Sequence, residues 1–175
     1  MRPRLVILLF LTIACGLVAG FVGQATAGKN TVAIRRVIPV RFGLCPIPSK
    51  YRAAFEKAAD QTNLPLALLA AVANVESNLD PNARSSAGAH GLFQILPSTA
   101  RELKLDVSTP AKNVIAGAHY LRQLEDEFHS TELMLAAYNA GPTAVIKAGY
   151  IAPNNASLAY VHEVEQLWTA LRGCR

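Results

Sequence analysis

The chain has 175 residues, of which 51% are hydrophobic, and its 17 Lys and Arg outnumber its 12 Asp and Glu to give a formal net charge of +5. The basic residues form no dense block with interleaved aromatic residues, so we expect no nucleic-acid partner. A mildly basic protein suits an anionic polymer such as a bacterial wall, and charge alone does not separate this from ordinary solubility.

The first 27 residues have the pattern of an export signal. Arg2 and Arg4 precede an apolar run from residue 5 to residue 22, and Ala25-Thr26-Ala27 is a small-residue cleavage site. The run is also close to the length of a membrane span, so an uncleaved anchor is the alternative, and it is the only membrane contact we expect. Residues 1–27 are therefore interpreted as a signal peptide, and the rest of the chain as exported to the periplasm or to the cell wall and extracellular space.

Residues 28–48 are interpreted as an extended basic leader, because prolines and arginines are scattered through them. Residues 49–175 are long enough for one domain with an adequate core, and we expect a monomer. Cys45 and Cys174 lie near the two ends of the exported part. In an oxidising compartment we expect them to form a disulfide that straps the leader onto the domain, and two free thiols are the alternative.

Helix signals dominate the exported part, and no period-two strand pattern is convincing. Ser49 is a candidate N-cap, and Thr109-Pro110 is a strong helix start. Gly, Pro, Asn and Asp mark a loop at 79–91 and a turn at 154–157. The helices predicted in chain order lie at about 49–61, 66–77, 97–103, 110–128, 131–140, 142–148 and 158–171. The predicted fold class is therefore all-α, with at most a minor short β element.

Glu76 ends an otherwise apolar helical stretch at residues 66–77. Its spacing of i, i+4 and i+8 with Leu68 and Val72 places the carboxyl group on their face of the helix. Burying a charged carboxylate is costly, and desolvation favours the protonated form, so we expect its pKa to be raised. A carboxylic acid that keeps its proton near neutral pH is what cleavage of a glycosidic bond needs. Glu76 is therefore the candidate general acid.

Glu76 also begins a longer pattern of residues at fixed spacing. After Glu76-Ser77 the chain has Pro81, Ser85, Gly88-Ala89-His90-Gly91-Leu92-Phe93-Gln94 and Pro97-Ser98-Thr99-Ala100; further on come Asn113, Gly117 and Tyr120-Leu121, then Ala137-Tyr138-Asn139-Ala140-Gly141-Pro142, and finally Tyr160-Val161. This order of motifs resembles that of lytic transglycosylases of the soluble Slt type, which share a lysozyme-like fold with goose-type lysozymes. The resemblance covers roughly residues 49–167, and several ordered motifs rarely coincide by chance.

The resemblance implies an enzyme that cleaves the β-1,4 bond between N-acetylmuramic acid and N-acetylglucosamine in peptidoglycan glycan strands without consuming water. Glu76 would be the single catalytic acid and base. It would first protonate the bridging oxygen and then, as a carboxylate, take the proton from the muramyl 6-hydroxyl, which closes a 1,6-anhydro ring. No cofactor is implied. We expect no metal either, because the four histidines are scattered without Cys or carboxylates at ligand spacing.

Five further residues are candidate substrate contacts by the same resemblance, namely Ser85, Gln94, Tyr138, Asn139 and Tyr160. Hydroxyl and amide groups of this kind exchange hydrogen bonds with the N-acetyl and hydroxyl groups of sugars. Structural alternatives stay open for several of them. Ser85 could serve only loop solubility, Gln94 could brace the loop as a buried amide, and Tyr138 or Tyr160 could be a core tyrosine with a satisfied hydroxyl.

The alternatives to a lytic transglycosylase depend on particular residues. Asp80 could be the second carboxylate of an ordinary hydrolase, although a solvated turn residue before Pro81 is the favoured interpretation. Ala156 and Ser157 stand where the family usually has Glu-Thr ahead of the last Tyr, so the contact with the last helix is where this chain departs from the pattern. The alternative functions are a hydrolytic muramidase on the same fold and a non-catalytic wall-binding or secretion-apparatus component.

Overall fold

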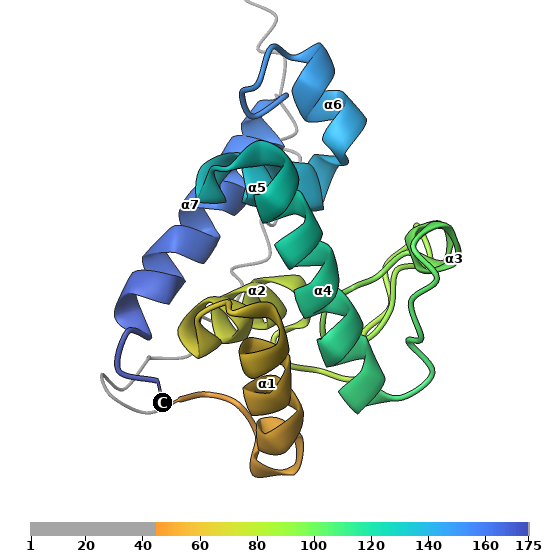
Figure 1. Ribbon diagram of the computed structural model, residues 1–175, viewed down its shortest axis with the longest axis vertical. Coiled ribbons are helices and arrows are strands. Elements are labelled where there is room, and N and C mark those ends of the chain that lie inside the picture. Colours follow the sequence, from red (N-terminus) through yellow and green to blue (C-terminus); the bar gives the residue numbers. More distant parts are fainter. Residues whose placement is uncertain (1–44, 175) are drawn as a thin grey trace, which may run out of the picture. The chain divides into compact units, whose positions relative to one another are not determined.

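The computed structural model describes residues 45–174, and this part of the chain is helical (Figure 1). Its elements are α1 (Ser49–Thr62), α2 (Leu66–Ser77), α3 (Pro97–Glu102), α4 (Pro110–Phe128), α5 (Thr131–Ala140), α6 (Pro142–Lys147) and α7 (Asn155–Ala170). No strand forms within the described range, where two isolated β-bridges join Arg84 to His90 and His90 to Ile95. The predicted all-α class is confirmed. The predicted signal peptide and most of the leader at 28–48 lie outside the described residues.

The helix starts follow local capping chemistry, with two corrections to the sequence analysis. Thr109 caps α4 as predicted, since its side chain accepts a hydrogen bond from the Lys112 N–H. Ser49 is the first residue of α1 and not its N-cap, a position that Pro48 occupies without a side-chain bond. The predicted turn at 154–157 is wrong: Asn154 caps α7 through a bond from the Ser157 N–H, so the helix begins at Asn155.

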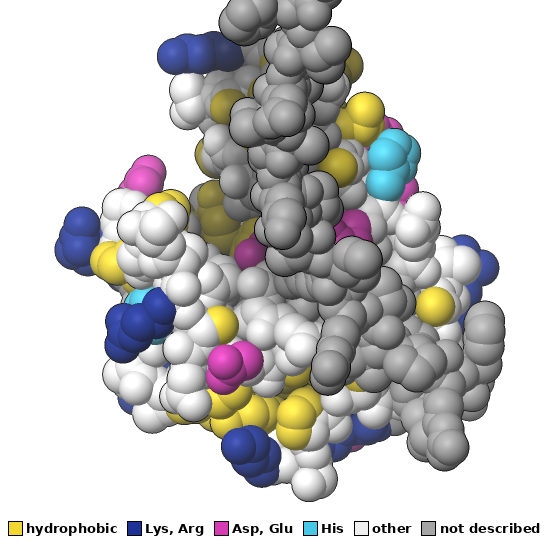
Figure 2. Space-filling model, turned by 180° about the vertical axis from the view of Figure 1, so that it is seen from behind, with side chains coloured by type: hydrophobic (Ala, Val, Ile, Leu, Met, Phe, Trp, Pro, Cys, Tyr) yellow, Lys and Arg dark blue, Asp and Glu magenta, His cyan; other side chains and the backbone are white. Residues whose placement is uncertain are grey.

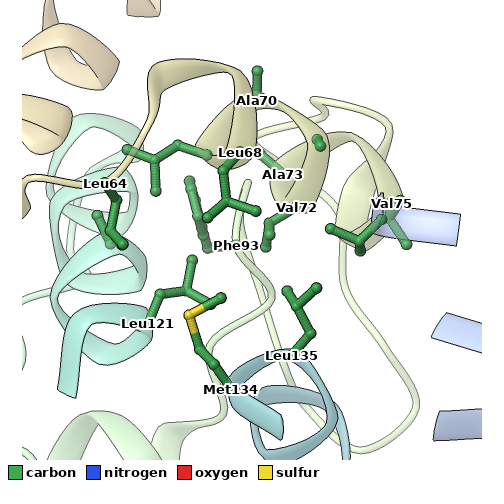
Figure 3. Packing of buried hydrophobic residues seen from close by; sticks show 14 of the residues in the cluster. Leu64, Leu68, Ala70, Val72, Ala73, Val75, Phe93, Leu121, Met134 and Leu135 are labelled. Atoms are coloured by element: carbon green, nitrogen blue, oxygen red, sulfur yellow. The ribbon is translucent and has the colours of Figure 1, made fainter. Parts of the chain in front are cut away.

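α2 passes through the middle of the core, and nearly all of its residues are buried. Figure 3 shows Phe93, which comes from the turn after the long loop, lying between α2 and the helices α4 and α5. The residues labelled around it are Leu68 and Val72 of α2, Leu121 of α4, and Met134 and Leu135 of α5, all at most 2% exposed. Burying each such side chain contributes about 1.5–3 kcal/mol. The end of α2, which carries Glu76, is therefore anchored in the best-packed part of the chain.

The helix contacts bring α7 back to the core. α1 packs on α4, α4 on α5, and α7 on both α2 and α5 (Figure 1). The chain after α7 ends beside the start of the described range, where a disulfide joins Cys45 to Cys174 with 4.6 Å between their Cα atoms. The predicted disulfide is thus present in the structure. It fixes the far end of the helix that carries Tyr160.

The surface charge and the helix lengths bear on the partners expected from the sequence. On the face drawn in Figure 2, the coloured Lys and Arg side chains stand apart from one another and do not gather into one dense patch. Within residues 45–174, none of the helices has the length and hydropathy that a membrane span needs. The apolar run at residues 5–22 is not among the described residues.

Candidate active site

Glu76 lies in the last turn of α2 and meets the packed face of α7. The hydroxyl of Tyr160 donates a hydrogen bond to Glu76 Oε1 at 2.7 Å. Leu68 and Val72, which share the helix face with Glu76, are buried, and Glu76 itself is half-buried. The carboxyl group therefore sits at the edge of the core, held on one side by a buried donor.

The phenol of Tyr160 is a donor over the whole working pH range. Its burial, and next the negative charge of Glu76, raise the pKa of Tyr160 well above its ordinary value of 10.0. A hydroxyl that keeps its proton stabilises the charged form of the carboxylate that it contacts. Tyr160, predicted as a site residue, is thus in direct contact with the predicted acid.

Tyr138 is close to the same carboxyl group but is bonded elsewhere. Its hydroxyl donates to the main-chain carbonyl of Phe93 at 2.8 Å. Burial, followed by the charge of Glu76, raises the pKa of Tyr138 well above 10.0. Tyr138 therefore forms part of the wall beside Glu76, and its hydroxyl is committed to the turn that carries Phe93.

The end of α2 is tied to that turn by Ser77. The Ser77 hydroxyl lies 2.9 Å from the carbonyl oxygen of Leu92 and 3.0 Å from that of Ala73, one turn earlier in α2. Asn78 then ends the helix in the left-handed conformation, with φ of 54°, and its N–H donates to the Asn74 carbonyl. These contacts fix the last turn of α2, and with it the backbone that carries Glu76.

α4 holds the turn at residues 90–94 from the other side. The side chain of Asn113, 1% exposed, accepts the Phe93 N–H at 2.9 Å and donates to the His90 carbonyl at 3.1 Å. One turn on, a Cβ at Gly117 would lie 2.3 Å from the Phe93 ring, so only glycine lets the ring fit against the helix. Asn113 and Gly117 belong to the predicted motif pattern, but this role was not predicted for them. The available signal was a polar residue and a glycine, spaced i and i+4, within an otherwise buried helix face.

Gln94 and Ser85 both brace the long loop. Gln94 has a φ of 45°, and its Nε2 donates to the carbonyls of Ala83 at 3.0 Å and Gly91 at 2.9 Å. The exposed Ser85 accepts the Ala89 N–H on its hydroxyl oxygen at 3.1 Å. The bracing alternative for Gln94 is therefore realised, and sugar contact by either side chain stays a prediction.

A pocket of about 180 Å³ lies beside Tyr138. Its lining residues are Gln94, Ile95, Leu96, Thr99, Tyr120, Tyr138, Asn139, Ala140 and Gly141. The rings of Tyr120 and Tyr138 lie 5.3 Å apart and form one wall. The pocket thus brings together three of the predicted site residues, Gln94, Tyr138 and Asn139, whereas Glu76, Ser85 and Tyr160 do not line it.

The departure from the family pattern near the last helix leaves a contact in place. Ser157 is 1% exposed, and its hydroxyl donates to Asn139 Oδ1 at 3.1 Å. Ala156 is exposed. A hydroxyl at residue 157 therefore links the first turn of α7 to the predicted site residue Asn139, although serine stands there in place of threonine.

Asp80, the alternative second carboxylate, is part of a turn. It is exposed, and its Oδ1 accepts the Asn82 N–H at 2.8 Å. This is the solvated turn favoured by the sequence analysis. Among residues 45–174, no group of three or more His, Cys, Asp or Glu side chains is placed to hold a metal ion.

An all-α domain that places a half-buried glutamate against a buried tyrosine hydroxyl agrees with the lysozyme-like fold that the motifs predict. A sequence profile of the family described as "Transglycosylase SLT domain" matches residues 53–160, and the chain belongs to this family. The confirmed resemblance covers the region from α1 to Tyr160.

Individual relatives agree with this assignment. The chain is 35% identical over 111 residues to a membrane-bound lytic murein transglycosylase F of Alkalilimnicola ehrlichii. This alignment covers 59% of this chain and 25% of the relative. The crystal structure of the 70 kDa soluble lytic transglycosylase of Escherichia coli has a TM-score of 0.63 and 26% identity, over 72% of this chain and 24% of that one. Its complex with bulgecin A gives a TM-score of 0.62 at 26% identity, over 71% and 24%. The chain thus spans only about a quarter of the length of these relatives.

Proposed function

We propose that this protein is an exported lytic transglycosylase that cleaves the β-1,4 bond between N-acetylmuramic acid and N-acetylglucosamine in peptidoglycan. The observation that carries the proposal is the hydrogen bond from Tyr160 to Glu76 at 2.7 Å, in a chain of the transglycosylase SLT domain family. The names of the relatives, which are lytic murein transglycosylases, point to the same substrate.

In the first step, protonated Glu76 gives its proton to the bridging oxygen. The bond between that oxygen and the muramyl anomeric carbon breaks, its electron pair stays on the oxygen, and an oxocarbenium-like sugar forms. Tyr160 assists by donating to Oε1, which stabilises the carboxylate that Glu76 becomes.

In the second step, the Glu76 carboxylate takes the proton from the muramyl 6-hydroxyl. The oxygen attacks the anomeric carbon, and the new bond closes the 1,6-anhydro ring while Glu76 regains its starting proton. No water enters the product, and one carboxyl group serves as acid and then as base.

Product analysis separates this lyase from a hydrolytic muramidase. We expect mass spectrometry of digested sacculi to show anhydro-muropeptides, which are one water lighter than hydrolysis products. Reducing-end products alone would overturn the lyase. A matched Asp80→Asn variant tests the two-carboxylate alternative, and it is expected to keep full activity because Asp80 is exposed and engaged in a turn.

The Glu76→Gln variant separates an enzyme from a non-catalytic wall-binding component. The amide keeps the shape of the side chain but has no acidic proton to give. We expect wall clearing to fall by at least about 10³-fold, which lies within the usual range of about 10²–10⁴ for one acid–base group. Sacculus binding in a pull-down is expected to persist. Clearing that survives in this variant would contradict the mechanism.

Export is part of the proposal. It is supported by the apolar run at residues 5–22 and by Ala25-Thr26-Ala27 after it. We expect the mature protein outside the cytoplasm with an N-terminus at residue 28, as read by intact mass after cell fractionation. A full-length mass in the membrane fraction would support the anchor instead.

A further inference from the structure

We propose that Ser157 is a positioning residue that turns the side-chain amide of Asn139 so that its NH₂ group faces the ligand in the pocket beside Tyr138. In this orientation Asn139 binds an acceptor oxygen of a sugar, such as an acetamido carbonyl or a hydroxyl oxygen. The inference rests on the proposed function, because it takes the pocket to be part of the glycan-binding site.

The direction of the hydrogen bond between these residues follows from burial. Ser157 is 1% exposed, and its backbone N–H is already used by the Asn154 cap at 2.9 Å. A hydroxyl this deeply buried needs an acceptor for its proton. Asn139 Oδ1 lies 3.1 Å from the Ser157 hydroxyl and is the acceptor that the described residues provide.

The orientation of the amide decides what it can bind. An asparagine amide has one oxygen that accepts and one nitrogen that donates twice. Asn139 is exposed and lines the pocket, and its oxygen is directed to Ser157. Its nitrogen is therefore the group left for a ligand. Rotation of the amide by a half-turn would exchange donor for acceptor and would leave the Ser157 proton without a partner.

A second amide in the same pocket is oriented in the opposite sense. Gln94 uses its NH₂ group for the carbonyls of Ala83 and Gly91, so its oxygen is the group that it offers. One pocket thus contains an amide donor and an amide acceptor, each fixed by contacts within the protein. This pairing fits a ligand that carries both a carbonyl and an N–H, as an acetamido group does.

The test measures binding without turnover, in the Glu76→Gln background, with a disaccharide-repeat glycan fragment and its de-N-acetylated form as probes. Adding Ser157→Ala is expected to weaken binding of the acetylated fragment about fivefold, the size of one neutral hydrogen bond. Ser157→Thr keeps the hydroxyl and is expected to restore binding. Asn139→Asp, which keeps the acceptor and loses the donor, is expected to weaken binding at least as much as Ser157→Ala.

The Asn154→Ala variant is the control for a merely structural role. It removes the cap of the same helix turn but leaves the Ser157 hydroxyl and Asn139 unchanged. We expect it to lower the melting temperature by roughly 2–4 °C, the shift of about one lost cap, with unchanged glycan binding. If Ser157→Ala lowers the melting temperature similarly and leaves binding unchanged, the positioning role is overturned.

The two probes identify the acceptor oxygen. If Asn139 reads an acetamido carbonyl, de-N-acetylation weakens binding, and Ser157→Ala reduces that difference. If it reads a hydroxyl oxygen, Ser157→Ala weakens both probes equally, which also supports the positioning role. Failure of the Glu76→Gln protein itself to bind either probe would instead overturn the proposed function together with this inference.

Discussion

The two tyrosines beside Glu76 come from different helices and are held in different ways. On the α7 side, the Tyr160 hydroxyl bonds the carboxyl group of Glu76 itself. On the α5 side, the Tyr138 hydroxyl bonds the main-chain carbonyl of Phe93. Tyr160 is buried and Tyr138 is partly buried, and both have raised pKa values, chiefly because burial disfavours the phenolate. The same side chain therefore acts on the candidate acid directly in one case and fixes the wall of the site in the other.

This difference shows that proximity to the acid does not define a chemical role. Tyr160 belongs to a helix whose far end is secured by a disulfide, whereas Tyr138 depends on a turn secured by Asn113 of α4. Changes on the α7 side should alter the proton transfer, and changes on the α5 side should alter binding and stability.

The largest expected effect is loss of the disulfide. The bridge joins residues 129 positions apart, and in the chain-entropy model closing so long a loop contributes about 4–5 kcal/mol. Cys45→Ala combined with Cys174→Ala should lower the free energy of unfolding by up to this amount in urea titrations. Amide hydrogen exchange should accelerate in α7 before α5. Equal acceleration in both helices would contradict a special dependence of the α7 side on the bridge.

Tyr160→Phe should have the next largest effect. It removes a hydrogen bond to a group that becomes charged, worth about 1.5–3 kcal/mol, so the cleavage rate should fall roughly 10- to 100-fold. A carboxylate that loses a donor is easier to protonate, so the alkaline limb of the pH–rate profile should move to higher pH. Steady-state rates on purified sacculi across pH measure both changes. A wild-type rate and profile would remove Tyr160 from the mechanism.

Tyr138→Phe should have a smaller effect of another kind. It leaves the buried Phe93 carbonyl without its donor, at a cost of about 1–3 kcal/mol in stability. We expect activity to fall less than in Tyr160→Phe, through weaker substrate binding. The alkaline limb should not move, since Tyr138 makes no hydrogen bond to Glu76. A shift as large as that of Tyr160→Phe would erase the distinction between the two sides.

The smallest expected effect is on stability at high pH, above the range in which the enzyme works. Both phenols have pKa values above 10.0 in the folded protein, so the folded state binds more protons than the unfolded state once unfolded tyrosines ionise. The contribution of the two tyrosines to stability is complete below the ordinary tyrosine pKa of 10.0 and falls as the pH rises towards their folded pKa values. The melting temperature, followed from about pH 8 to about pH 11, should fall less steeply in either Phe variant. An unchanged slope in both variants would contradict this assignment.

The helices and the place of Glu76 on its helix could be predicted because their signals are local. The i, i+4, i+8 spacing of Glu76 depends on α2 alone, and the Thr109 cap depends on three neighbouring residues. The error at α7 was also local: Asn154 and Asn155 are typical of turns, and only the capped first turn distinguishes a helix start from a loop.

The partners of the site residues could not be predicted from local patterns, because they come from distant parts of the chain; only the family resemblance placed Tyr160 near Glu76. Tyr160 and Glu76 are 84 positions apart, and Tyr138 and Phe93 are 45 apart. Nothing near Tyr138 indicates that its hydroxyl bonds a carbonyl and not the acid. The bridge between Ser157 and Asn139 also runs between two helices, and the sequence shows only that the residue type differs from the family pattern.

The close approach of Gly117 to the Phe93 ring links what can change at the two positions. A methyl group at residue 117 has no space while the ring is there, so Gly117→Ala alone strains the core. With a smaller residue such as leucine at position 93, the same methyl group fills a gap. The two substitutions are therefore epistatic: the double variant should lose less free energy of unfolding than the summed losses of the two single variants. The Phe93 carbonyl also accepts the hydrogen bond of Tyr138. Such an exchange of side-chain size inside the core would therefore shift the position of the Tyr138 wall beside Glu76.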